Sequence, residues 1–337
     1  MDYSVFKGKK IILIIPNHYK IPELMKYNVE RLGMKVTVAS SKPFKYKHLG
    51  HKLHNAFRKT FYKDRTFKKA LEKRYNFEEV LKQTASLKEK ADYVLIIRPD
   101  AIPLQQTDLV FSLGKRVVAY QWDGLNRYPE IFEYIKKYKH FYSFDPDDYQ
   151  RYKDQYPQLK LCTNFYFDDD RVEEVTLNNS VYYAGAYVAN RIEDTLFLVN
   201  ELAKYDLPLD INISGIEPHK YFHDRTHINF ASFSFMENLR RTKSAKVLLD
   251  FKIVEHNGLS MRFFEALKYK KKIITNNTTV VNYDFYNPNN IFILHKDPLE
   301  RLDDFLHSNY EEIPEDIVQY YAFSSWLYRL LEGEYRQ

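Results

Sequence analysis

Cysteine is almost absent from the sequence, since Cys162 is the only one in 337 residues. A single cysteine cannot form an internal disulfide, and it excludes cysteine-rich zinc sites and CxxC redox chemistry. Long hydrophobic runs are absent too. None approaches the ~18–20 residues of a membrane span, and the apolar stretch 11–16 is too short for the core of a signal peptide. With a mean hydropathy of −0.54, the sequence predicts a soluble protein of a reducing, cytoplasmic compartment.

Several catalytic and binding motifs are also missing. The sequence has no G-x-S-x-G elbow, no P-loop and no HExxH zinc motif. No G-x-G-x-x-G follows a predicted strand, which argues against a Rossmann dehydrogenase. RNP, zinc-finger and other nucleic-acid reading motifs are absent, and we expect no nucleic-acid partner.

Positive charge is crowded into one segment, although the whole chain carries only +6. Residues 42–75 hold twelve lysines and arginines, opposed only by Asp64 and Glu72. The segment therefore carries +10, and the rest of the chain carries −4. The basic isoelectric point of 8.9 belongs to this segment alone.

Apolar residues recur at helical spacing within the same segment. Leu53, Phe57 and Phe61 lie four residues apart, which places them on one face of a helix. A basic helix with an aromatic stripe suits an anionic membrane surface or a phosphate-bearing ligand. A helix packed on the core with a solvated lysine face is the alternative. The first interpretation predicts a protein peripheral to the inner face of the plasma membrane.

Strands alternate with helices along the first half of the chain. Apolar runs predict strands at 10–16, 34–39, 92–98, 115–121, 140–144 and 159–165. Helices are predicted at 21–32 and 76–88. Such alternation is typical of an α/β fold with a parallel, doubly wound sheet, so residues 1–172 are predicted to form a Rossmann-like domain.

The same alternation restarts after a linker rich in Asp and Asn at 167–179. Strands are predicted at 180–184, 209–214, 245–249, 272–276 and 290–294, with a helix at 192–205. Residues 180–315 are therefore predicted to form a second Rossmann-like domain, and 316–337 a helical segment. Two such domains are expected to hold a ligand in a cleft at the carboxyl ends of their strands.

The strongest functional signal is the stretch 257–277, NGLSMRFFEALKYKKKIITNN. Gly258 and Ser260 precede a predicted helix, whose free N–H groups and positive end favour an anion such as a diphosphate. Arg262 can add a bidentate phosphate contact. Glu265 lies three residues further on the same face, where its carboxylate can accept hydrogen bonds from both ribose hydroxyls. A capped helix with a surface Arg–Glu pair is the alternative.

This stretch resembles the donor-binding region of GT-B glycosyltransferases, where G-x-x-x-R-x-x-E-A-L-x-x-G-K-x-x-I-T precedes a strand. YYAGAYVANR (182–191) and NYDFYNPNNIFIL (282–294) are similar to the start and tail of the same domain. The likeness, over about 182–294, is to bacterial lipopolysaccharide and capsular polysaccharide biosynthesis proteins of the CgeB-like and group 1 transferase kind. It implies a GT-B fold of two Rossmann-like domains facing a central cleft, with a C-terminal helix that can cross back.

The resemblance also implies which residues hold a nucleotide-sugar donor: Gly185, Arg191, Asn257, Gly258, Ser260, Arg262 and Glu265. Glu265 would bind the ribose, and Arg262 and Ser260 the phosphates. Asn257 stands where many group 1 transferases have a second glutamate, so the sugar contact and the stereochemical outcome stay open. GT-B enzymes generally need no catalytic metal, and we expect no metal and no other cofactor.

Candidate catalytic and acceptor residues follow strands of the first half. Asp123 could take a proton from an acceptor hydroxyl, and Trp122 could stack on a sugar ring. Asn17 and His18 follow the first strand, and histidine is suited to base catalysis. An Asp-Gly turn and an inert loop histidine are the alternatives.

Two acidic clusters, at 145–148 and 168–170, could pass for metal-binding Asp-x-Asp motifs. The first follows a strand and precedes a helix, where Asp and Pro are common caps. We predict a metal site at neither.

Together these features predict a glycosyltransferase that moves a sugar from a nucleotide-diphosphate donor to a cell-surface glycan precursor, such as a lipid-linked one. A non-catalytic nucleotide- or carbohydrate-binding protein on a degenerate GT-B scaffold is the alternative.

Overall fold

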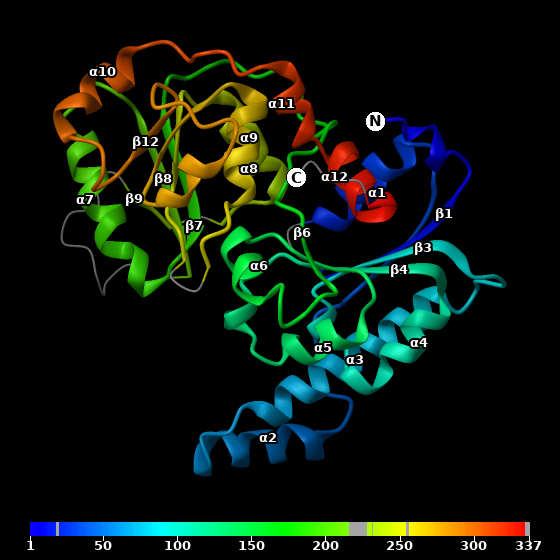
Figure 1. Ribbon diagram of the computed structural model, residues 1–337. Coiled ribbons are helices and arrows are strands. Elements are labelled where there is room, and N and C mark those ends of the chain that lie inside the picture. Colours follow the sequence, from blue (N-terminus) through cyan, green and yellow to red (C-terminus); the bar gives the residue numbers. More distant parts are fainter. Residues whose placement is uncertain (18–19, 216–227, 231, 254–255, 334–337) are drawn as a thin grey trace. The chain divides into compact units, whose positions relative to one another are not determined.

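The computed structural model describes residues 1–17, 20–215, 228–230, 232–253 and 256–333 (Figure 1). The chain divides into two compact units. Unit 1 comprises Met1–Ser143, Asp148–Cys162 and the described part of Tyr328–Gln337, and unit 2 comprises Phe144–Asp147 and Thr163–Leu327.

This division differs from the predicted boundaries at 172, 180 and 315. The chain enters unit 2 at Thr163, ahead of the predicted linker, because Phe165 and Phe167 pack on Phe323 with ring centroids 5.2 and 5.4 Å apart. Residues 316–327, predicted as part of a separate segment, also belong to unit 2.

Unit 1 is built on a parallel sheet of six strands in the order β2-β1-β3-β4-β5-β6. The strands are β1 (Lys10–Ile15), β2 (Lys35–Ser40), β3 (Ala91–Ile97), β4 (Gly114–Gln121), β5 (Phe141–Ser143) and β6 (Leu159–Leu161). Its helices are α1 (Ile21–Arg31), α2 (Leu49–Phe61), α3 (Thr66–Thr84), α4 (Thr107–Ser112) and α5 (Ile131–Lys137). The strand order reverses between β1 and β3, as in a doubly wound fold.

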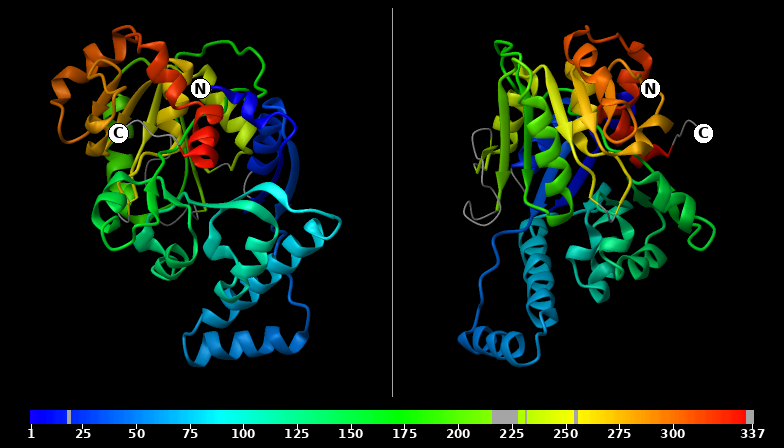
Figure 2. Two further views of the ribbon diagram at one scale, coloured as in Figure 1. Left: turned by 45° about the vertical axis from the view of Figure 1, so that its right-hand side comes forward. Right: turned by 90° about the vertical axis from the view of Figure 1, so that its left-hand side faces the viewer.

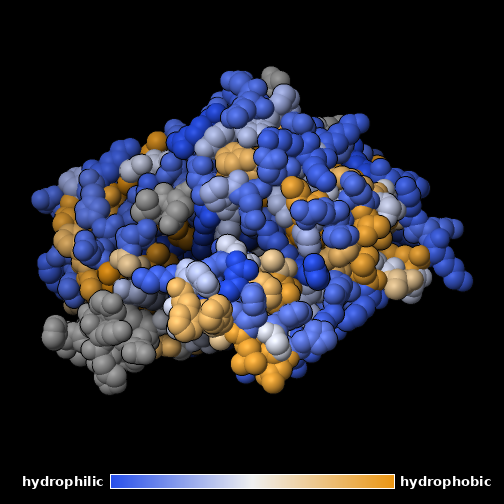
Figure 3. All heavy atoms as spheres, turned by 90° about the horizontal axis from the view of Figure 1, so that it is seen from below, coloured by the Kyte–Doolittle hydropathy of each residue, from blue (hydrophilic) through white to orange (hydrophobic). Residues whose placement is uncertain are grey.

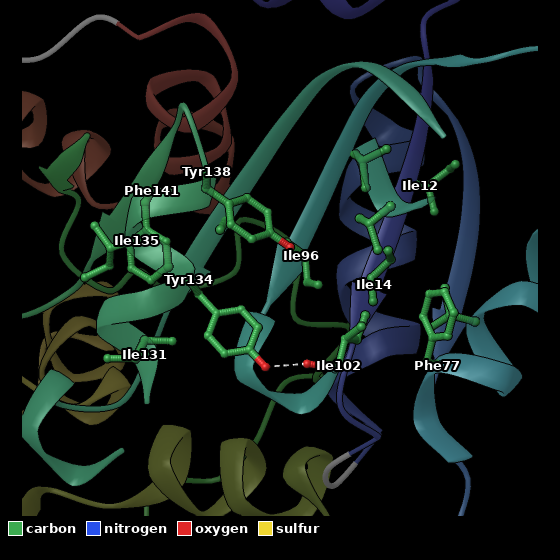
Figure 4. Close-up of a cluster of buried hydrophobic side chains, with 14 of the residues drawn as sticks. Ile12, Ile14, Phe77, Ile96, Ile102, Ile131, Tyr134, Ile135, Tyr138 and Phe141 are labelled. Atoms are coloured by element: carbon green, nitrogen blue, oxygen red, sulfur yellow. Dashed lines mark hydrogen bonds between the residues drawn. The ribbon is translucent and has the colours of Figure 1, made fainter. Parts of the chain in front are cut away.

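The burial of the strands in the core of unit 1 explains why their sequences are unbroken apolar runs. Residues 11–15 of β1 are all buried, as expected for a parallel strand with both faces covered. One cluster joins Ile12 and Ile14 to Phe77 of α3 (Figure 4). In the same cluster the buried Tyr134 hydroxyl donates a hydrogen bond of 2.6 Å to the Ile102 carbonyl, so this polar group is satisfied inside the core.

The basic segment forms two helices, α2 and α3, separated by a short turn. Lys63 has a left-handed φ of 51°, and the Asp64 carboxylate accepts a 2.7 Å hydrogen bond from the Thr66 N–H at the start of α3. The predicted helix at 76–88 is the second half of α3, not a separate element. Figures 1 and 2 show α2 at the outer end of α3, away from the sheet of unit 1.

Unit 2 repeats the architecture with a second parallel sheet, in the order β12-β11-β10-β7-β8-β9. Its strands are β7 (Val181–Ala186), β8 (Leu209–Ser214), β9 (Ile228–Asn229), β10 (Val247–Asp250), β11 (Lys272–Thr275) and β12 (Ile291–Ile293). Its helices are α7 (Ile192–Leu202), α8 (Phe235–Ser244), α9 (Met261–Tyr269), α10 (Leu302–His307) and α11 (Glu315–Tyr320). Here the strand order reverses between β7 and β10.

Two helices span the division between the units, α6 (Pro146–Tyr152) and α12 (Phe323–Glu332). The predicted C-terminal helix is broken in two because Tyr166 pairs with the backbone between α11 and α12. Its N–H donates to the Tyr321 carbonyl at 3.0 Å, and its carbonyl accepts from the Phe323 N–H at 2.8 Å. No helix in the described ranges is long and apolar enough to cross a membrane.

Candidate functional site

A cavity of about 250 Å³ lies in unit 2 at the carboxyl ends of β7 and β10. This is the point at which the strand order reverses, where doubly wound sheets bind their ligands. Ala184 and Asp250 line the cavity from the two strands, and Ser260, Met261 and Arg262 line it from the start of α9.

The beginning of α9 presents unpaired backbone donors to this cavity. Ser260 is the N-cap residue, but its hydroxyl donates to an Asp250 carboxylate oxygen at 2.6 Å instead of capping the helix. Within the described part of the chain, the N–H groups of Met261 and Arg262 have no hydrogen-bond acceptor. Free N–H groups at the positive end of a helix favour an anion, so the predicted anion-binding end of α9 is open to a ligand.

Glu265, one turn into α9, contributes a buried carboxylate to the cavity. Its side chain is 4% exposed and lines the cavity, and it makes no hydrogen bond or ion pair with any described residue. Burial raises the pKa of Glu265 to about 7, although the nearby Arg262 acts in the opposite direction. An unpaired buried carboxylate is costly, and ligand hydroxyls that donate to it would relieve that cost.

Arg262 is held by the protein itself. Its guanidinium donates to Asp250 at 3.0 Å and to the Ala184 carbonyl at 2.5 Å, and it lies 5.3 Å from the ring centroid of Tyr183. Burial opposes the charge, but Asp250 outweighs it and raises the pKa of Arg262. The surface Arg–Glu pair considered as an alternative is therefore not formed, because the arginine pairs with Asp250.

The charge around the cavity favours an anionic ligand. Three cations, Arg191, Lys252 and Arg262, face two carboxylates, Asp250 and Glu265. Arg191 forms no ion pair or side-chain hydrogen bond within the described ranges, and its Nε is buried without an acceptor. Three cations against two carboxylates leave these side chains with a net positive charge even when both carboxylates are ionised.

The two predicted glycines are required by the protein's own packing. A Cβ at Gly258 would lie 2.5 Å from a ring carbon of Phe144 and 3.0 Å from the Cα of Asp145. A Cβ at Gly185 would lie 2.5 Å from the Tyr183 hydroxyl. Gly258 lines the cavity, but the close approach that it permits is to residues 144–145.

Asn257 fixes the loop before α9. Its N–H donates to Asp145 at 2.8 Å, and its side-chain amide donates to Asp147 at 2.7 Å. Its side-chain oxygen accepts from Lys252 at 3.1 Å, and its carbonyl accepts from the Asn277 side chain at 3.0 Å. Both side-chain atoms are thus engaged by the protein, although the sequence predicted a donor contact for Asn257.

Five polar residues of the cavity were not predicted from the sequence: Asn238, Asp250, Lys252, His256 and Asn277. Asp250 closes the apolar strand VLLD, so the rule that ligands bind at the carboxyl ends of strands could have identified it. The contact between Asn277 and Asn257 joins positions 20 residues apart, and no local sequence pattern predicts it.

The candidates from the first half lie in unit 1. The two Asp123 carboxylate oxygens each accept a 2.7 Å hydrogen bond, one from Arg98 and the other from Arg127. Trp122 is half-buried after β4, and Asn17 is exposed after β1. His18 lies outside the described residues. The roles assigned to these four residues stay predictions.

The two acidic clusters hold the chain in place. Asp145 accepts the N–H groups of Asp147 and Asn257 at 2.9 and 2.8 Å. Asp168 accepts the N–H and hydroxyl of Ser324 at 2.8 and 2.9 Å. Among the residues that the structure describes, no three His, Cys, Asp or Glu side chains are grouped so as to hold a metal ion.

Solved structures similar to nearly the whole chain share this architecture. An alpha-glucosyltransferase in complex with UDP-glucose and DNA containing an abasic site is 11% identical, with a TM-score of 0.50 over 96% of this chain and 95% of that one. Sucrose-phosphate synthase from Thermosynechococcus elongatus is 12% identical, with a TM-score of 0.50 over 96% and 92%. The N-terminal domain of Candida albicans trehalose-6-phosphate phosphatase is 10% identical, with a TM-score of 0.54 over 97% and 94%.

No family model matches the sequence, and no curated protein matches it. At identities of 10–12% these likenesses show the fold alone. The chain has the GT-B fold of two Rossmann-like domains, each with a parallel six-stranded sheet. The predicted fold class is confirmed.

Proposed function

We propose that this protein is a glycosyltransferase that binds a nucleotide-diphosphate sugar in the cavity of unit 2. The observation that carries the proposal is the buried, unpaired Glu265 one turn beyond the open amino end of α9. A donor needs an anion site and a hydroxyl acceptor about one helical turn apart, and α9 presents both to the same cavity.

Each group of the cavity has a role in this proposal. The Met261 and Arg262 N–H groups and the unpaired Arg191 bind the diphosphate. Glu265 accepts hydrogen bonds from the ribose hydroxyls. Asp250 positions the Ser260 hydroxyl and the Arg262 guanidinium, both of which it contacts.

Catalysis would come mainly from stabilising the departing diphosphate. The helix end and the cations are already in place before reaction, so they stabilise the developing negative charge without reorganisation. Unit 1 would bind the acceptor through Asn17 and Trp122, with Asp123 or His18 as the base. We further propose that the reaction needs no metal, and that the acceptor is a cytoplasmic precursor of a cell-surface glycan.

A non-catalytic nucleotide- or carbohydrate-binding protein is the second candidate. It is favoured by Asn257, which stands where many group 1 transferases have a glutamate and whose side chain is hydrogen-bonded to Asp147 and Lys252. Such a protein would bind the nucleotide and leave the sugar attached.

Calorimetric titration of the purified chain with UDP and GDP tests the donor site. We expect binding to at least one of them and a loss of roughly tenfold or more in Glu265→Ala, because two charge-assisted hydrogen bonds disappear. Glu315→Ala, an exposed position on α11, is the matched control. Unchanged affinity in Glu265→Ala would contradict the assignment. Release of sugar from the matching donor separates the enzyme from the non-catalytic protein.

A further inference from the structure

Helix α2 carries a stripe of large apolar side chains that nothing in the described chain covers. Leu49, Leu53, Phe57 and Phe61 are 71%, 63%, 49% and 71% exposed, and the helix has no buried residue. Their spacing of four residues places them on one face. The stripe runs the whole length of α2, from Leu49 to Phe61.

The flank of α2 next to Phe61 is the one that contacts the rest of unit 1. His54 packs on Phe67 of α3 with ring centroids 4.6 Å apart, and the Arg58 guanidinium lies 5.7 Å from the same ring. The apolar stripe therefore does not hold α2 to the protein. Single exposed apolar residues are normal, but a contiguous row of them marks an interaction surface. Figure 3 shows hydrophobic patches among hydrophilic surroundings on this side of the molecule.

Positive charge without an ion-pair partner lies in the same segment as the stripe. Five of the twelve basic residues of segment 42–75 form ion pairs: Lys42, Lys47, Arg58, Lys68 and Lys73. The other seven form no ion pair within the described residues: Lys45, Lys52, Lys59, Lys63, Arg65, Lys69 and Arg74. At 100° per residue, Lys52 and Lys59 share one flank of α2, roughly 60–80° beyond the Leu49 edge of the stripe.

This combination identifies the partner by its chemistry. A second copy of α2 would bring another +10 segment against the first, which opposes self-association. A nucleic acid would neutralise the charge but leave the row of leucines and phenylalanines in water. An anionic bilayer satisfies both, because its acyl boundary takes up the apolar face and its headgroup phosphates neutralise the lysines.

We propose that α2 lies in the surface plane of an anionic membrane. Leu49, Leu53, Phe57 and Phe61 enter the boundary between headgroups and acyl chains, and the unpaired lysines and arginines contact lipid phosphates. The helix lies on the membrane and does not cross it. This inference does not depend on the donor site, because α2 belongs to unit 1 and the cavity belongs to unit 2.

Vesicle flotation of the full chain tests the proposal. We expect binding to phosphatidylcholine vesicles with about 30% phosphatidylglycerol to exceed binding to pure phosphatidylcholine by roughly tenfold or more at low salt, and to weaken as salt is added. Equal binding to the two kinds of vesicle, or binding to neither, would overturn it.

Matched variants separate the apolar from the electrostatic contribution. Leu53→Glu with Phe57→Glu should abolish binding at every salt concentration, whereas Lys52→Glu with Lys59→Glu should remove only the preference for anionic lipid. Leu109→Glu, at a 47% exposed leucine of α4 in the same unit, should bind as the unchanged chain does. If it lost binding as the stripe variant does, the α2 assignment would be refuted.

Three further measurements exclude other occupants and misfolding. Tryptophan fluorescence of Phe57→Trp should shift to shorter wavelength on anionic vesicles and be quenched by brominated acyl chains. Sedimentation without lipid should show one species for the unchanged chain and the stripe variant, and self-association abolished by Leu53→Glu would refute the proposal. UDP titration of the stripe variant should match that of the unchanged chain, which shows that unit 2 is folded and keeps the two proposals distinguishable.

Discussion

At the scale of single residues, the cavity of unit 2 depends on a carboxylate and an arginine that do not neutralise each other. Arg262 is bound by Asp250 and the Ala184 carbonyl, so Glu265 keeps its hydrogen-bonding capacity for a ligand. Holding this carboxylate in a buried position lowers the free energy of unfolding when the carboxylate is ionised. The effect should appear in the pH dependence of stability.

We expect Glu265→Gln to stabilise the protein at pH 8 and to change little at pH 4.5. The folded-state pKa of Glu265 is about 7, above its ordinary value of 4.5, so the folded state holds this proton more tightly than the unfolded state. The free energy of unfolding therefore falls as pH rises from 4.5 to 7, and glutamine removes that loss. The gain at pH 8 should be about 2–3 kcal/mol, measured by urea unfolding. A destabilisation of equal size at both pH values would contradict this picture.

Single residues also show where prediction from sequence stops. The open end of α9 and the position of Glu265 follow from local spacing, because a helix face is fixed by residues three and four apart. The ion-pair partner of Arg262 cannot be predicted from local spacing, because Asp250 approaches Arg262 only once β10 pairs with β7 and α9 packs beside these strands. Gly258 was predicted among the donor-binding residues, but the atom closest to its missing side chain belongs to Phe144.

At the scale of elements, the loop before α9 is a packed structure rather than a free hinge. It is joined to residues 145–147 through Asn257 and to the segment after β11 through Asn277 and Thr279. The structure therefore predicts that this loop tolerates no added volume on the side of Phe144.

Gly258→Ala should destabilise unit 2 by about 1–3 kcal/mol. The added methyl would lie 2.5 Å from the Phe144 ring and 3.0 Å from the Asp145 backbone, and the backbone cannot move as a flexible side chain can. Gly50→Ala in α2 is the control, because nothing lies within 4 Å of its Cβ position and alanine favours the helix by about 0.5–1 kcal/mol. Denaturant unfolding of both variants measures the difference, and equal stability would show that the loop can shift.

Element boundaries were hardest to predict where distant residues decide them. α3 runs on through Tyr75 and Asn76 because nothing in that stretch stops a helix. The predicted C-terminal helix does stop, because Tyr166 bonds to the backbone on both sides of Ala322. The first case is local and could have been recognised, whereas the second needs a contact over more than 150 residues.

At the scale of the whole molecule, the two sheets share the same kind of strand order. Each reverses its strand order once, between β1 and β3 in unit 1 and between β7 and β10 in unit 2. The alternation of strands and helices made this architecture predictable, since parallel strands require helical crossovers. The cavity of unit 2 lies where the strand order reverses, which is where the donor was predicted to bind from the sequence.

A melting experiment on the whole chain with a series of nucleotides distinguishes the donor site from a dinucleotide site. A ligand that binds only the folded state at 100 times its Kd adds about 2.7 kcal/mol, enough to raise Tm by several degrees at ~2–4 °C per kcal/mol. We expect such a shift with UDP, GDP or dTDP, and none with NAD⁺, because no glycine-rich dinucleotide motif follows any strand. The shift, rather than Tm itself, should shrink in Glu265→Ala, since the baseline stability of that variant also changes. A Tm shift with NAD⁺ alone would contradict the sugar-nucleotide site and indicate a dinucleotide site instead. A Tm shift with a nucleotide that is unchanged in Glu265→Ala would show that the nucleotide binds away from α9.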